Sequence, residues 1–238
     1  MNITELEQIY QSALDQCISN ISLIPDPQHG GPALPLTIQP PQGYQDSRMK
    51  VMYFGQETNG WSDPLNKDLP FHKDLKMQDL LRIYDEFANN KNGVRHSGQF
   101  WTAVNHFQRD FSQIEPDCRF LYNNLIKMGK LWDKGKPPAS VMEWQSGWFD
   151  LICDEIRILN PDVIIFFSGP NYDYLIRRIL GQVSFEEVAG YKTRKLARVV
   201  SPKLPYQSFR TYHPNYLWRV NLQAVLDTIT SSIRDRKP

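Results

Sequence analysis

One run of apolar residues constrains the fold of this chain more than any other feature. Val163–Phe167 is apolar without interruption and is bounded by Asp162 and Ser168. A strand with one solvated face alternates apolar and polar residues, whereas a strand of a parallel sheet is covered on both faces and is apolar throughout. The run therefore predicts a central parallel strand in a sheet that carries helices on both faces.

Strand and helix patterns alternate along the rest of the chain. Strands are predicted at 49–54, 118–125, 162–168 and 207–212. Helices are predicted at 2–21, 74–90, 98–111, 140–159, 172–180 and 216–233, where apolar residues recur at helical spacing. The alternation predicts the α/β class, as a three-layer α/β/α sandwich around a central, mainly parallel, four-stranded sheet. Residues 183–188 and 197–201 fit either a short hairpin or a pair of edge strands.

Composition favours one large globular domain. Hydrophobic residues make up 41% of the sequence, and no apolar run is long enough to span a bilayer. We predict a single domain over residues 1–238, in which 1–47 form an N-terminal helix and a proline-rich strap packed on the rest. Isolated cysteines and the lack of a visible signal peptide predict a cytoplasmic protein, nucleoid-associated if bacterial. We expect a monomer that binds no membrane, metal or organic cofactor, since no Cys/His spacing resembles a zinc site.

Three of the predicted strands end in polar residues. These polar residues include Glu57, Asn123 and His213. Because the carboxyl ends of parallel strands share one edge of a sheet, we expect these side chains to converge. A carboxylate can orient water or stabilise a cation, an amide can read the edge of a base, and an imidazole can donate to an oxygen that becomes negative.

Each of these residues also has a structural interpretation, which stays open. Glu57 fits a solvated loop after a strand, Asn123 can tie down a loop, and His213 can cap a turn. Phe71, a candidate to stack on a base, is of a residue type found more often in a core. Only the joint placement at strand ends favours a functional site.

Charge is distributed unevenly along a chain whose net charge is only +1. Residues 188–226 contain no Asp or Glu and carry seven basic residues: Lys192, Arg194, Lys195, Arg198, Lys203, Arg210 and Arg219. Lys127 opens a second basic stretch, over 127–138. Such a face can bind a polyanion, or it can be a solvated surface balanced by acidic neighbours in space. Both interpretations stay open.

Five short segments resemble, in order, motifs of the uracil-DNA glycosylase superfamily, and most closely its single-strand-selective monofunctional branch. The segments are Gly55–Gly60, Leu69–Phe71, Ser97–Trp101, Phe120–Asn123 and His213–Leu217. The first is similar to the family's Gly-Gln-Asp-Pro-Tyr or Gly-Met-Asn-Pro-Gly loop, and the last to its His-Pro-Ser-Pro-Leu/Arg loop. The resemblance implies a uracil-DNA glycosylase-like fold and DNA as the partner. It also implies hydrolysis of the N-glycosidic bond of uracil in base excision repair.

The resemblance also implies roles for individual residues. Glu57 stands where the family has the Asp or Asn that positions water and faces the cationic sugar. Backbone amides near Gly55 and Gln56, and the ring of His213, would stabilise the leaving uracil anion. Asn123 would read the base.

Further contacts follow from the same resemblance and from the basic segments. Phe71 would stack on a base that has left the duplex stack or lies in a single strand. Leu217 matches the position of the wedge that fills the vacated space, and Asn215 belongs to the loop that grips the backbone. The remaining DNA-contact candidates are basic: Lys127, Lys192, Arg194, Lys195 and Arg219.

The chain departs from the family pattern at several positions. Glu57 is one methylene longer than Asp, which displaces a carboxylate by about 1 Å. Thr58–Asn59 replaces Pro-Tyr or Pro-Gly, and Asn215–Tyr216 replaces Ser-Pro. Three functions therefore stay open: a glycosylase for uracil or a related damaged base, a nucleic-acid or nucleotide binding module on the same fold, and a hydrolase of small nucleosides.

Overall fold

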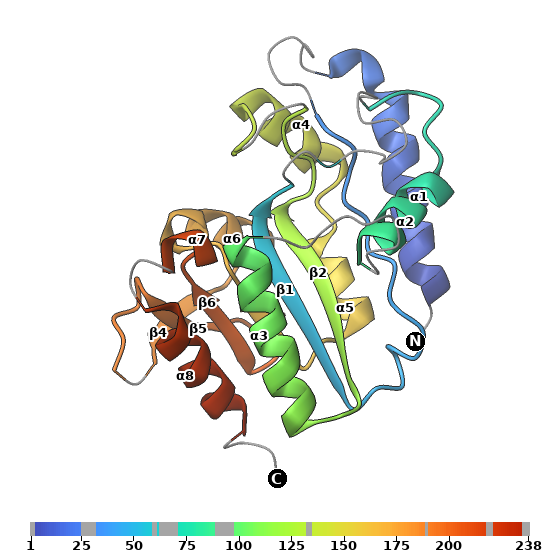
Figure 1. Cartoon of the computed structure of the whole chain (residues 1–238). Helices are drawn as coiled ribbons and strands as arrows, with labels where there is room; N and C mark the ends of the chain where they lie inside the picture. Colours follow the sequence, from blue (N-terminus) through green and yellow to red (C-terminus); the bar gives the residue numbers. More distant parts are fainter. Residues whose placement is uncertain are drawn as a thin grey trace. The chain divides into compact units, whose positions relative to one another are not determined.

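The described residues form an α/β protein with a six-stranded, mostly parallel sheet and eight α-helices (Figure 1). This computed structural model describes residues 3–24, 32–58, 61, 71–88, 98–131, 135–188, 190–217 and 221–234. The strands are β1 (Met49–Glu57), β2 (Cys118–Ile126), β3 (Val163–Phe166), β4 (Ser184–Glu187), β5 (Leu196–Val200) and β6 (Gln207–Thr211). The helices are α1 (Ile3–Ser19), α2 (Met77–Ala88), α3 (Gln99–Ile114), α4 (Ala139–Trp148), α5 (Ile152–Leu159), α6 (Asp173–Leu180), α7 (Pro214–Leu217) and α8 (Leu222–Arg234), with short 3-10 turns η1 (Ile21–Leu23) and η3 (Pro170–Tyr172).

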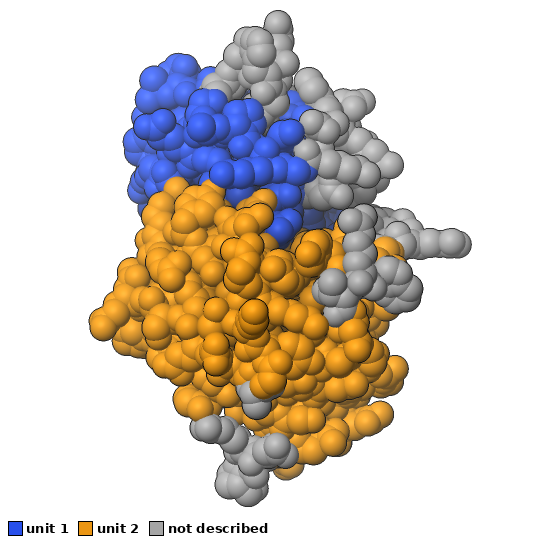
Figure 2. Space-filling view, turned by 90° about the vertical axis from the view of Figure 1, so that its left-hand side faces the viewer, with its two compact units in different colours: residues 1–41, 56–94, 123–158 blue, residues 42–55, 95–122, 159–238 orange. Residues whose placement is uncertain are grey.

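The chain forms two compact units that alternate along the sequence (Figure 2). Unit 1 comprises residues 1–41, 56–94 and 123–158, and unit 2 comprises 42–55, 95–122 and 159–238. Strands β1 and β2 each begin in unit 2 and end in unit 1. Because the chain passes back and forth, the two units are not successive domains.

The sheet has the strand order β2-β1-β3-β6-β5-β4. Strand β3 is parallel to β1 and to β6, which confirms the central parallel strand predicted from its apolar run. The number of strands is six and not four, because β4 and β5 form an antiparallel hairpin that extends the sheet beyond β6. This pairing confirms the hairpin, which is one of the two structures predicted for residues 183–188 and 197–201.

Helices cover both faces of the sheet in unit 2. Phe209 of β6 belongs to a core cluster with Phe107 of α3 and Val225 of α8, the two helices that lie over one face in Figure 1. The next residue, Arg210, reaches Asp173 at the start of α6 with an Nε–Oδ1 distance of 2.9 Å. Successive side chains of a strand point to opposite faces, so α6 covers the face opposite α3 and α8.

Two predicted helices are each divided. The helix predicted over 140–159 is α4 followed by α5, because Phe149 leaves helical backbone angles and buries its ring against Tyr10 at a centroid distance of 6.3 Å. The helix predicted over 216–233 is α7 and α8, and Asn221 begins α8 by accepting a hydrogen bond from the Ala224 amide at 3.2 Å. Across the ranges given above, no helix is long and apolar enough to cross a membrane.

Residues 32–41 of the proline-rich strap are bound within unit 1. Residues 33–38 are almost completely buried. The amide of Ala33 donates to the carbonyl of Gly129 at 3.0 Å, and the amide of Leu36 donates to that of Lys127 at 2.9 Å. Extended backbone without regular structure is thereby satisfied by the segment that follows β2.

Gly129 lies so close to Thr58 that a side chain does not fit between them. A Cβ on Gly129 would overlap the carbonyl oxygen of Thr58 and lie 2.5 Å from its Oγ1. We expect Gly129→Ala to lower the free energy of unfolding by about 1–3 kcal/mol, because backbone must shift. The matched control is Gly147 of α4, whose Cβ would meet nothing within 4 Å. Gly147→Ala should instead raise stability by about 0.5–1 kcal/mol. Urea unfolding of both variants measures the change in the free energy of unfolding. A change of the same sign in the two variants would contradict the prediction.

Candidate functional site

In unit 2, the carboxyl ends of the parallel strands lie level along one edge of the sheet. Phe54 of β1 pairs with Phe166 of β3, and Phe166 pairs with Arg210 of β6. Gly55 is the next residue of β1, and His213 lies two residues beyond the end of β6. Gly55 and His213 therefore belong to the same edge of the sheet, where ligands bind in open α/β folds.

An aromatic cluster backs the His213 ring. The imidazole stacks on Phe100 of α3 at a centroid distance of 5.6 Å and an interplanar angle of 28°. Phe100 in turn contacts Trp101 at 5.3 Å, and Tyr122 and Phe167 at 5.6 Å each. These rings replace water around one face of the imidazole. Phe100, which resembles a family motif residue, contributes here to the environment of His213.

The His213 imidazole is neutral and held in one tautomer. Burial lowers the pKa of His213 from 6.5 to about 4, because an imidazolium is poorly solvated among aromatic rings. The backbone amide of Asn215 donates to Nδ1 at 3.3 Å, which places the proton of the neutral ring on Nε2. At neutral pH, His213 therefore offers an Nε2–H donor that carries no charge.

The low pKa of His213 predicts a pH-dependent loss of stability. As pH falls below 6.5, the unfolded chain binds a proton at this histidine, whereas the folded protein does not until pH is about 4. The unfolded state therefore gains protons first, so stability falls across this window and levels off below it. Urea unfolding across that range should show a steeper fall for the parent than for His213→Phe, which keeps a ring against Phe100. His72→Phe is the control for loss of a partly exposed imidazole. A difference between parent and His213→Phe that does not vary with pH would contradict the prediction.

The predicted DNA-contact residues after His213 differ in exposure. Asn215 is exposed, but Leu217 is 0% exposed and belongs to the core cluster of unit 2. Leu217 therefore packs as a core side chain and does not project as a wedge. Tyr216 is instead the exposed apolar side chain of this loop, at 48%, and it contacts Tyr212 with a ring distance of 4.6 Å. The replacement of a motif proline by Tyr216 was the sequence signal for this surface aromatic.

In unit 1, the end of β1 is anchored through Thr58. Gln56 and Glu57, the last residues of the strand, are partly buried. Thr58 follows with 1% exposure, and its Oγ1 accepts a hydrogen bond from the Gly129 amide at 2.7 Å. Thr58 thus fixes the chain directly after Glu57. Asn59 and Gly60 lie outside the described residues.

Asn123 lies inside a buried polar network of unit 1. Its side chain is 0% exposed and donates through Nδ2 to Glu155 Oε2 at 2.8 Å. Its Oδ1 accepts from Lys127 Nζ at 2.7 Å and from the Asn124 amide at 2.8 Å. The side-chain amide of Asn123 is therefore engaged within the protein. Recognition of a base by Asn123 stays a prediction, and it requires some of these hydrogen bonds to be replaced by bonds to the base.

Lys127 belongs to the same network and not to a surface. Its side chain is 2% exposed, and its Nζ lies 2.6 Å from Glu155 Oε1. That oxygen also accepts from the Tyr10 hydroxyl at 2.5 Å, which itself accepts from the Ile38 amide at 3.0 Å. Burial lowers the pKa of Lys127 by more than the Glu155 charge raises it. The structure thus corrects the expectation that Lys127 presents a charge to DNA phosphates, because its charge is satisfied in the interior.

Phe71 is also an interior residue of unit 1. It is 6% exposed and packs edge-to-face on Trp144 of α4, with ring centroids 5.7 Å apart. The core interpretation accounts for these contacts, and stacking of Phe71 on a base stays a prediction. Leu69, Pro70 and Ser97, which complete two of the family-like segments, lie outside the described residues.

The basic segment of unit 2 is exposed only in part. Lys192 and Arg194 are exposed, and Lys195 is partly buried with its ammonium 5.0 Å from the ring centre of Tyr191. Arg210 is buried in its ion pair with Asp173. Binding of a polyanion to the exposed members stays a prediction, as does a role for Arg219, which lies outside the described residues.

The candidate residues lie in both units. Unit 2 supplies a neutral, oriented imidazole at the carboxyl edge of the sheet, with an exposed tyrosine three residues further along the chain. Unit 1 supplies a partly buried carboxylate at the end of β1 and a buried asparagine held by an ion pair. Comparison of the chain with protein-family models and with curated proteins gives no match in either case.

Proposed function

We propose that the protein is a monofunctional DNA N-glycosylase on a uracil-DNA glycosylase-like fold, acting on uracil or a related damaged base. The observation that carries the proposal is the neutral His213, with its proton on Nε2 and its ring backed by Phe100. When the glycosidic bond of a pyrimidine breaks, negative charge collects on a carbonyl oxygen of the leaving base. A fixed, uncharged donor in a poorly hydrated site stabilises such an oxygen without protonating it beforehand.

Glu57 supplies the complementary charge in this proposal. The sugar becomes an oxocarbenium-like cation as the base departs, and a carboxylate stabilises that cation and orients the attacking water. Glu57 is the last residue of β1, two residues beyond Gly55. The backbone amides of Gly55 and Gln56 are the further donors assigned to the base.

Recognition of DNA is assigned to the exposed residues of unit 2. The phosphate backbone would be contacted by Lys192, Arg194 and Asn215. Such contacts add affinity but do not distinguish one base sequence from another. Tyr216 would stack on an exposed base, because aromatic rings hold unpaired bases in proteins that bind single strands. Asn123 would read the target base after exchanging one of its internal hydrogen bonds.

A binding module on the same fold is the second candidate. Burial of Asn123 in its network favours this alternative, since the amide can read a base only by giving up an internal hydrogen bond. Such a protein would bind single-stranded DNA, with an affinity that falls steeply as salt increases, and would release no base.

The test is release of free base from a single-stranded oligonucleotide that carries one labelled uracil. Release by the parent protein supports the glycosylase. Binding without release, at high protein concentration and over several damaged bases, supports the binding module. Cleavage of free deoxyuridine with flat salt dependence would reject both in favour of a nucleoside hydrolase.

A further inference from the structure

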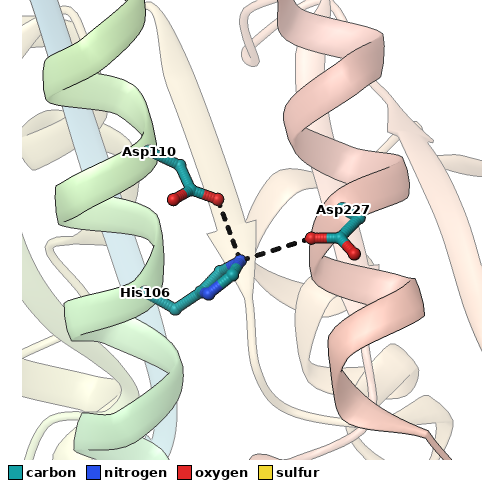
Figure 3. Close-up of side chains that lie close together, drawn as sticks. All are labelled: His106, Asp110 and Asp227. Carbon is teal, nitrogen blue, oxygen red and sulfur yellow. Dashed lines mark ion pairs between the residues drawn. The ribbon is translucent and has the colours of Figure 1, made fainter.

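A histidine and two aspartates converge between two helices of unit 2, in a position that the proposed glycosylase chemistry does not use (Figure 3). His106 and Asp110 lie one turn apart on α3, and Asp227 faces them from α8. The His106 Nε2 is 2.9 Å from Asp110 Oδ2 and 3.6 Å from Asp227 Oδ1. Among the described residues, these three atoms form a group whose members all lie within 4.8 Å of one another.

The two spacings from His106 Nε2 suit one bound ion. Nitrogen and oxygen ligands of a divalent transition metal lie about 2.0–2.2 Å from it. Two ligands of one ion are then about 3.0–3.5 Å apart in octahedral or tetrahedral geometry. The two distances from His106 Nε2, 2.9 and 3.6 Å, lie close to this range without any movement of the helices.

A fourth donor lies beside the three. The side-chain amide of Gln223 is one turn before Asp227, and its terminal nitrogen lies 3.3 Å from His106 Nε2 and 2.7 Å from Asp227 Oδ1. The two ends of such an amide exchange by rotation about one bond, which would place Oε1 in the same position. Two pairs of ligands at i and i+4 then face each other across α3 and α8, as in metal sites built between helices.

Burial gives the cluster a closed side and an open side. The His106 and Asp110 side chains are 9% and 16% exposed, whereas the Asp227 side chain is 56% exposed. An ion can therefore enter from the Asp227 side and lose most of its water against the other two ligands.

Arg109 opposes metal binding in the structure as it stands. One guanidinium nitrogen lies 2.8 Å from His106 Nδ1, and another donates to Asp110 Oδ1 at 3.0 Å. A donor at Nδ1 keeps the proton of the neutral imidazole on Nε2, the atom that a metal needs. The Arg109 side chain is 63% exposed, so it can turn away into solvent.

We propose that His106, Asp110, Asp227 and Gln223 bind one divalent transition-metal ion, such as Zn²⁺ or Mn²⁺, and that the ion joins α3 to α8. Imidazole together with carboxylates suits these ions better than Mg²⁺ or Ca²⁺, which take oxygen ligands. Binding displaces the proton from Nε2, moves it to Nδ1, and releases Arg109 from the ring. The proposal is independent of glycosylase activity.

The test uses the full chain without a histidine tag, stripped with a chelator and titrated with Zn²⁺, Mn²⁺ and Mg²⁺ by calorimetry and thermal unfolding. We expect one Zn²⁺ per chain and a rise in Tm of about 5–10 °C at a hundredfold excess over Kd, with Mg²⁺ far weaker. Asp227→Asn should weaken Zn²⁺ binding at least ~10-fold. Arg109→Gln should strengthen it, because the competing donor is gone.

Two controls separate this site from adventitious binding. Glu186→Gln removes an exposed carboxylate of β4 outside the cluster and should leave the affinity unchanged. A Co²⁺ spectrum without a thiolate charge-transfer band would exclude Cys153, a partly exposed thiol. Absence of a Tm shift in the parent, equal affinities of parent and Asp227→Asn, or a thiolate band would each overturn the proposal.

Discussion

Glu57→Gln and His213→Phe are each expected to lower the rate of uracil release by about 10²–10³-fold while the protein remains folded. Glu57→Gln removes the negative charge opposite the cationic sugar and keeps the size of the side chain. His213→Phe removes the Nε2–H donor and keeps an aromatic ring against Phe100, which the imidazole contacts at 5.6 Å. Each substitution removes an interaction that strengthens only as the bond breaks, so the rate constant falls and not the affinity for DNA.

Single-turnover rates with excess enzyme, measured beside DNA affinity, separate these effects. The matched control for Glu57→Gln is Glu187→Gln, which neutralises a carboxylate that also ends a strand but lies exposed at the sheet edge. Lys192→Gln should reduce DNA affinity and the salt dependence of binding, and leave the single-turnover rate unchanged. Parent-like rates in Glu57→Gln and His213→Phe would reject the assigned roles even if uracil is released.

His213 shows how far a sequence can specify a site. The position of His213 at a strand end follows from the alternation of strands and helices, because carboxyl ends of parallel strands share an edge. Its lowered pKa depends on burial against residues such as Phe100, which is more than a hundred residues away in the chain and contacts the ring only once α3 has packed on the sheet. The sequence predicts where the donor lies, but not its pKa or its tautomer.

The full extent of the sheet and the interior charges are the features that the sequence does not reveal. It predicts strands at 183–188 and 197–201, but only their pairing in the structure shows that they extend the sheet beyond β6. Lys127 resembles a phosphate contact because it begins a basic stretch. Its partner Glu155 is 28 residues further along, on α5, where an acidic residue is ordinary on a solvated helix face. Only the packing of α5 shows that both charges are interior.

Lys127→Met is expected to destabilise the protein by about 3–5 kcal/mol, because it leaves the Glu155 carboxylate buried without a cation. Glu155 is 0% exposed, and its remaining donors are the Tyr10 hydroxyl and the Asn123 amide, both neutral. Two neutral hydrogen bonds do not compensate a buried charge. Methionine fills a similar volume, so lost packing contributes little to the expected change.

The measurement is the free energy of unfolding in urea, with Lys76→Met as the matched control. Lys76 is an exposed lysine of unit 1, and its replacement should change stability by less than about 0.5 kcal/mol. The double variant Lys127→Met, Glu155→Gln removes both charges, so it should be more stable than the sum of the single effects predicts.

If the destabilisations by Lys127→Met and Glu155→Gln simply add, Glu155 does not depend on Lys127 for its charge, and the buried ion pair does not hold Asn123 in place. If instead Lys127→Met also raises the rate of base release, freeing the Asn123 amide from the network assists base reading, and the network restrains the proposed site.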